Sequence, residues 1–144
     1  MHNLEKLRIL VVEDNVDDIK VLKRAMRDSD EKCELYFARD GEEALDALAQ
    51  RGEFKAIPSP DLILMNINLP KIDGLEVLCK VKEDDRLRRI PVVVLTVSER
   101  KEDMVKAYDC GAASYMVKPV DPAEFKRLTE TISAYWHFVW NSSE

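Results

Sequence analysis

Polar side chains at four separate places in the sequence could act together on a phosphoryl group and a divalent cation. Each place directly follows a short apolar run, and the side chains are two acids, an amide, a hydroxyl and an ammonium group: Glu13, Asp14, Asn66, Thr96 and Lys118. The two carboxylates, the side chain at position 66 and a backbone carbonyl near Asn68 would supply the oxygen ligands that Mg²⁺ prefers. Thr96 and Lys118 would then donate to phosphoryl oxygens. The set predicts a pocket for Mg²⁺-assisted phosphoryl chemistry.

The predicted pocket lacks a nucleophile, because position 66 carries an amide. A carboxylate there could attack phosphorus and carry an acyl phosphate, whereas the nitrogen lone pair of Asn66 is delocalised and the side chain has no negative charge. We therefore expect that Asn66 does not accept phosphate. Both a natural divergence and an introduced Asp→Asn change are consistent with the sequence.

The apolar pattern predicts the elements that must position these groups. Runs of strand length alternate with segments of helical periodicity, which is the order of parallel strands joined by crossover helices. We expect strands at 7–12, 35–38, 62–65, 90–95 and 115–117. In an open parallel sheet, ligands bind beyond the carboxyl ends of the strands, so groups from four strand ends would converge there.

Helix-start signals follow three of the predicted strands. Asn15, Ser98 and Asp121 are the expected N-terminal caps of the first, fourth and last helices. The fourth helix has a weak apolar face with many charges, which makes it a candidate moving part.

Composition limits the classes of function. A chain of 144 residues with 46% hydrophobic and 35% charged residues suits a single domain spanning 1–144. Its net charge of −6 disfavours nucleic-acid binding. No apolar run is long enough to cross a membrane and the start carries no signal core, so we expect a cytoplasmic protein. Cys33, Cys79 and Cys110 are scattered and odd in number, which favours reduced thiols over a disulfide or a zinc site.

Several motifs together resemble the receiver domains of two-component response regulators over essentially the full length. They are Val-Val-Glu13-Asp14-Asn, the stretch 66–74, Val-Leu-Thr96 and Tyr115-Met-Val-Lys118-Pro119. The resemblance implies a flavodoxin-like (βα)5 doubly wound α/β fold with strand order 2-1-3-4-5. It also implies the roles of single residues: Glu13 and Asp14 as the acidic metal pair, Thr96 as the switch hydroxyl, Tyr115 as the rotating aromatic, Lys118 as the phosphate-binding lysine, and Asn66 in the place of the phosphoacceptor aspartate.

Three further segments, 57–64, 85–96 and 134–140, resemble the stand-alone response regulators associated with phytochromes. This resemblance implies a sensor histidine kinase, such as a phytochrome, as the partner. Because no sequence follows Glu144 for an output domain, we expect the output to be protein contact.

The last predicted helix carries more aromatic residues than a core needs. One stripe at helical spacing faces the core: Phe125, Leu128, Ile132, Trp136 and Val139. Tyr135, Phe138 and Trp140 fall partly outside this stripe, in an extension at about 134–144. Exposed aromatic surface commonly marks association sites, so we predict a homodimer through this helix. The alternative is that the tail folds over the sheet edge.

Three classes of function are consistent with the sequence. The favoured one is a receiver module in phosphorelay signalling, not an enzyme and phosphorylation-deficient as written. The second is a phosphate-independent adaptor or decoy that binds a histidine kinase. The third, a small hydrolase, would need Asp14 as nucleophile, and the Asp-x-Asp pair expected there is missing. The simplest structural role for Lys118 is an ion pair with Asp14.

Overall fold

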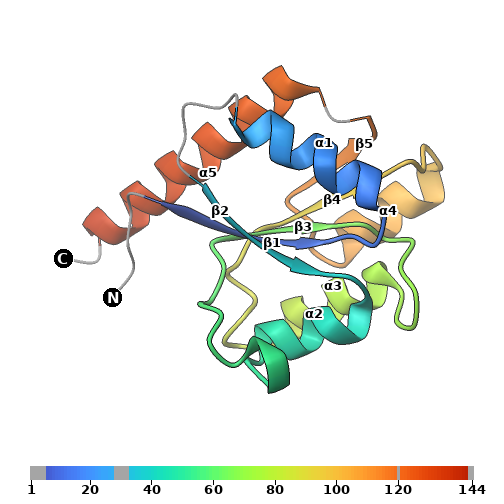
Figure 1. Ribbon diagram of the computed structural model, residues 1–144, viewed down its shortest axis with the longest axis horizontal. Helices are drawn as coiled ribbons and strands as arrows, with labels where there is room; N and C mark the ends of the chain where they lie inside the picture. The colour runs from blue at the N-terminus through green and yellow to red at the C-terminus, as the bar shows by residue number, and fades with distance from the viewer. Residues whose placement is uncertain (1–5, 28–32, 120, 143–144) are drawn as a thin grey trace.

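A five-stranded parallel sheet forms the centre of the computed structural model, which describes residues 6–27, 33–119 and 121–142 (Figure 1). Its strands are β1 (Leu7–Val12), β2 (Cys33–Ala38), β3 (Leu62–Met65), β4 (Val92–Thr96) and β5 (Ser114–Val117). All pairings are parallel and the spatial order is β2-β1-β3-β4-β5. The predicted doubly wound fold and strand order are confirmed.

Helices cover both faces of the sheet. They are α1 (Val16–Arg27), α2 (Gly41–Leu48), α3 (Gly74–Glu83), α4 (Lys101–Asp109) and α5 (Pro122–Ser142), with a 3₁₀ turn, η1 (Gly52–Phe54), in the loop before β3. Helices α1 and α5 lie on one face, and α2 and α3 lie on the other (Figure 1). Ala107 of α4 belongs to the core on the α2–α3 side. The crossovers therefore place every strand end at one edge.

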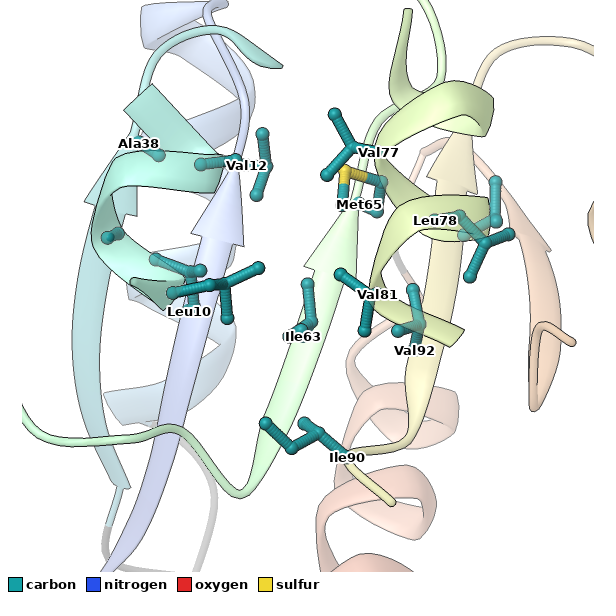
Figure 2. Close-up of a cluster of buried hydrophobic side chains, with 14 of the residues drawn as sticks. Leu10, Val12, Ala38, Ile63, Met65, Val77, Leu78, Val81, Ile90 and Val92 are labelled. Carbon is teal, nitrogen blue, oxygen red and sulfur yellow. The ribbon is translucent and has the colours of Figure 1, made fainter. Parts of the chain in front are cut away.

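Buried aliphatic side chains hold each helical layer to the sheet. Figure 2 shows the cluster between α3 and the strands, where Val77, Leu78 and Val81 of α3 meet Ile63 and other strand residues. A second cluster joins the opposite face to α1 and α5. Strand β3 is buried at every position, which explains its unbroken apolar sequence.

Two of the three predicted caps are present. The Asp18 N–H donates to Asn15 Oδ1 at 3.0 Å at the start of α1, and the Ala123 N–H donates to Asp121 Oδ1 at 2.8 Å at the start of α5. The prediction for Ser98 is wrong, because α4 begins at Lys101 and its N-cap is Arg100.

The expectation of three reduced cysteines is also wrong. Cys79 of α3 and Cys110, the C-cap of α4, form a disulfide with a Cα–Cα distance of 5.0 Å. The two residues are 31 positions apart in sequence, so their spacing gave no sign of the bond. The fold brings them together because α3 and α4 lie beside each other on the same face.

The peripheral helices differ in how firmly the core holds them. Ala107 is the one buried residue in the fully described helix α4, while Val105 and Tyr108 are about half exposed. Helix α5 is anchored by Phe125 and Ile132. The aromatic side chains behind the dimer prediction, at positions 135–140, lie outside those that the structure describes. Among the described residues, no helix has the length and apolar character to cross a membrane.

Candidate functional site

An acidic hollow of about 470 Å³ lies at the carboxyl ends of β1, β3 and β5. Its lining includes the predicted site residues Glu13, Asp14, Asn66, Asn68 and Lys118, together with Asn15, Val16, Asp17, Asp18 and Val97. Four of these ten side chains are carboxylates and one is an ammonium group. Groups that are distant in sequence therefore converge, as the strand-end argument predicted.

Glu13 is the buried centre of this site, with 2% of its surface exposed. Its Oε1 accepts three hydrogen bonds at 3.1 Å, from Asn66 Nδ2 and from the backbone N–H groups of Asp14 and Asn15. Its Oε2 accepts from Lys118 Nζ at 2.5 Å. A buried carboxylate is tolerated when it is paired and hydrogen-bonded in this way.

The Asn66 side chain is held at both ends of its amide. Its Nδ2 donates to Glu13, and its Oδ1 accepts from the Asn68 N–H at 3.0 Å. Only 9% of its surface is exposed. The amide thus does what a carboxylate could not do, because it donates a hydrogen bond to the neighbouring carboxylate.

Gly74 fixes the backbone behind Asn66. Its N–H donates to the Ile67 carbonyl at 3.0 Å. A Cβ at this position would lie 2.2 Å from the Asn66 carbonyl oxygen and 2.7 Å from Ile67 Cα. Both atoms belong to the backbone and cannot move aside cheaply, so the start of α3 approaches the site this closely only with glycine.

Lys118 makes two ion pairs. Its Nζ lies 2.5 Å from Glu13 Oε2 and 2.7 Å from Asp18 Oδ2, and 7% of its side chain is exposed. Burial lowers the pKa of Lys118, but the hydrogen bonds that the ammonium group donates to Asp18 and Glu13 outweigh this effect and leave the pKa raised. The alternative of a Lys118–Asp14 pair is wrong, because Asp18 takes that place.

Thr96 and Tyr115 stand behind the hollow and do not line it. Thr96 is fully buried, and its Oγ1 accepts from the Ser98 N–H at 3.2 Å. The Tyr115 hydroxyl donates to the Ser98 carbonyl at 3.0 Å. Both predicted switch residues therefore hold the same residue in the loop between β4 and α4.

Asp18 is the site residue that sequence reasoning missed. It lies in the first turn of α1, four residues before Leu22, which is 1% exposed and packs on the sheet. Side chains four apart share a helix face, so the position of Leu22 could have shown that Asp18 turns inward.

The oxygen donors suit a hard divalent cation, although they are few. Glu13 and Asp14 supply two carboxylates, and Asn66 and Asn68 supply amide or backbone oxygens in the same hollow. In the described part of the chain, no group of three or more His, Cys, Asp or Glu side chains is arranged to hold a metal ion. A carboxylate at position 66 would bring such a third acid, since Asn66 already contacts Glu13.

Comparison with known proteins agrees with this geometry. The sequence profile of the response regulator receiver domain matches residues 9–130. The chain is 38% identical over 128 residues to response regulator Rcp1 of Synechocystis sp., covering 89% of this chain and 87% of the relative. It resembles the crystal structure of the phosphorylated cyanobacterial phytochrome response regulator RcpA with a TM-score of 0.78 and 39% identity, covering 91% of this chain and 94% of that one. The Mn²⁺-bound form of Rcp1 is also similar, with a TM-score of 0.77 and 37% identity over 90% of this chain and 94% of that one.

The chain belongs to the family of response regulator receiver domains. Its relatives include phytochrome-associated regulators, as the three sequence segments indicated. Receiver domains of this family are signalling modules of two-component systems and not enzymes. The predicted family and class of function are therefore confirmed.

Proposed function

We propose that this chain is a receiver module that is phosphorylation-deficient as written, with Asn66 in the place of the phosphoacceptor. The contact of Asn66 Nδ2 with the buried Glu13 carboxylate carries this proposal. Position 66 lies at the end of the buried strand β3, inside the acidic hollow and near Lys118, where an acceptor is needed. The amide there has no anionic oxygen that could attack phosphorus.

We assign the hollow to Mg²⁺ as the resident cation. Glu13 and Asp14 would hold it, with weaker support from Asn66 and Asn68, and the ion would neutralise charge on a phosphoryl group. The similar Rcp1 structure is described as an Mn²⁺-bound form, which supports a divalent cation in this kind of domain. Lys118 would donate to phosphoryl oxygens, as its raised pKa keeps it charged.

Thr96 and Tyr115 are the proposed switch residues. Both are tied to Ser98, so a rearrangement at Thr96 would reach Tyr115 and the loop that leads into α4. Helix α4 is thinly anchored, which suits an element that repacks. Without a covalent phosphoryl group, the chain as written rests mainly in its inactive arrangement.

The proposed partner is a sensor histidine kinase linked to phytochrome signalling, in the cytoplasm. The relatives named as phytochrome response regulators support this partner class. A second function uses the same contact without phosphate, since a domain with an intact surface and an amide at position 66 could occupy the kinase as an adaptor or decoy. Kinase binding that the asparagine form retains in a binding assay would favour that second function.

Incubation with a small phosphodonor and Mg²⁺, followed by intact mass measurement, tests the proposal. We expect no mass gain for the chain as written and the gain of one phosphoryl group for Asn66→Asp. An added Lys118→Met change should slow this gain. Phosphorylation of the asparagine chain would reveal another acceptor and overturn the assignment of position 66. An Asn66→Asp chain that stays unmodified would equally contradict it.

Homodimer formation through the end of α5 is a separate proposal, supported by the aromatic composition of 134–144. We expect a dimer by light scattering for the full chain and a monomer for a chain truncated after Ala134. Circular dichroism must first show that the truncated chain is folded. A full-length chain that stays monomeric at high concentration contradicts the proposal.

A further inference from the structure

Asp18 lines the hollow, but it is neither one of the proposed cation ligands nor one of the residues proposed to bind a phosphoryl group. Its Oδ2 lies 2.7 Å from Lys118 Nζ, and the two residues are 100 positions apart in sequence. About a third of the Asp18 side chain is exposed, whereas Lys118 is 7% exposed. Asp18 therefore approaches the buried ammonium group from the solvent side of the site.

The two carboxylates that bind Lys118 differ in what a cation would do to them. Glu13 follows β1 directly and is one of the two acids proposed to hold Mg²⁺. A bound cation would coordinate the Glu13 carboxylate and so weaken the ion pair between Glu13 and Lys118. Asp18 extends from α1 to the lysine and would remain its carboxylate partner. A phosphoryl oxygen entering the hollow must then compete with Asp18 for the ammonium group.

We propose that Asp18 is a positioning residue. It pairs with the Lys118 ammonium group when no phosphoryl group is present, and it sets how readily the lysine binds a phosphoryl group. This inference rests on the proposed function, because it assigns Lys118 to the phosphoryl oxygens. Asp18 opposes phosphorylation by occupying the lysine, and once a phosphoryl group has taken the lysine, Asp18 is left without that ion pair. Asp18 thus tunes phosphorylation although it is neither a proposed metal ligand nor the acceptor position.

The neighbouring residue Asp17 provides a matched control. It lies in the same first turn of α1 and lines the same hollow, but it has no hydrogen bond or ion pair to Lys118. Asp17→Asn and Asp18→Asn each remove one negative charge from the hollow without changing side-chain size. Any difference between them reports the contact with Lys118, since a change in overall charge would affect both.

The first test measures phosphorylation in the Asn66→Asp chain, using phosphoramidate and Mg²⁺ with intact mass detection over time. We expect Asp18→Asn to speed phosphorylation about two- to fivefold, as removal of a partly exposed ion pair allows. Asp17→Asn should change the rate much less, and Asp18→Glu should restore the parent rate. Equal rates for Asp17→Asn and Asp18→Asn overturn the proposal, as does a slower rate for Asp18→Asn.

The second test needs no phosphorylation and uses the chain as written. Nitrogen-15 NMR should detect the Lys118 ammonium group, because its ion pairs and burial slow proton exchange with water. We expect Asp18→Asn to accelerate this exchange, while Asp17→Asn leaves it unchanged. An unaltered Lys118 signal in Asp18→Asn overturns the proposal.

The two tests separate this inference from the proposed function. If the Asn66→Asp chain takes no phosphoryl group at all, the proposed function fails, and the NMR experiment still reports whether Asp18 holds Lys118. If phosphorylation proceeds but the Asp18 and Asp17 variants behave alike, only the role of Asp18 is wrong.

Discussion

Asn66→Asp is expected to lower the free energy of unfolding by about 1–3 kcal/mol when divalent cations are chelated. Asn66 Nδ2 donates to Glu13 Oε1 at 3.1 Å, and the two residues are 9% and 2% exposed. The substitution replaces this donor with a second acceptor, so the buried Glu13 oxygen loses a hydrogen bond and gains a like charge beside it. Lys118, which already contacts Glu13, offsets part of the cost.

Mg²⁺ should reverse this loss in the aspartate form. The cation binds the folded hollow, and ligand at a hundredfold excess over Kd adds about 2.7 kcal/mol to the stability of the native state. The third carboxylate should also tighten Mg²⁺ binding relative to the asparagine chain. Urea unfolding of both chains in chelator and in Mg²⁺, at one pH and one ionic strength, measures the two effects together.

Asn68→Asp is the matched control for this experiment. It adds the same charge to the same hollow, but Asn68 is exposed and contacts Asn66 through its backbone N–H rather than its side chain. We expect its stability in chelator to change by no more than about 0.5 kcal/mol. Equal losses for the two variants would contradict the role of the Glu13 contact. An Asn66→Asp chain that is as stable as the parent in chelator would contradict the repulsion argument altogether.

The sheet could be predicted from the sequence because strands that are buried on both faces are apolar at every position. Strand β3 reads as an unbroken apolar run and is buried throughout. From that pattern and the alternation of helices, the strand-end rule placed Glu13, Asn66 and Lys118 in one hollow, and in the structure Asn66 and Lys118 each contact Glu13. Their convergence depends on topology alone, which explains why it could be predicted without coordinates.

Contacts that depend on side-chain direction were predicted less well. Lys118 reaches Asp18 and not Asp14, although Asp14 is the acid in the recognisable motif. The direction of a side chain in the first turn of α1 is set by how Leu22 seats that helix on the sheet. Ser98 is likewise of a residue type that often caps helices. Its hydroxyl instead donates to Asp103, and its backbone N–H and carbonyl bind Thr96 and Tyr115. Tertiary contacts decided both positions.

Reduction of the Cys79–Cys110 disulfide is expected to lower the free energy of unfolding by about 2–4 kcal/mol, the usual range for a native disulfide. The bond joins two positions 31 apart in sequence and closes a loop that contains β4 and α4. Opening it restores conformational freedom to the unfolded chain. Urea unfolding with and without dithiothreitol measures this difference, and the Cys79→Ser/Cys110→Ser chain should match the reduced parent in either condition.

Cys33→Ser is the control, because Cys33 lies outside this disulfide. This variant should respond to dithiothreitol as the parent does. A thiol assay on the unfolded, unreduced parent should find one reactive thiol among its three cysteines. Three reactive thiols, together with identical unfolding curves in both conditions, would restore the sequence-based expectation of reduced cysteines. The assay also bears on the predicted cytoplasmic location, where persistent disulfides are rare.

Loss of the disulfide should increase local opening most in α4. Ala107 is the one buried residue among the nine described residues of α4, so the bond at its C-cap is a main attachment to α3. After reduction we expect amide hydrogens at 101–109 to exchange faster, while those of the buried strand β3 change only as far as global stability requires. Uniform acceleration across both elements would show that the disulfide acts on global stability alone. Faster exchange confined to α4 would show that the disulfide restrains the helix that follows the proposed switch residue Thr96.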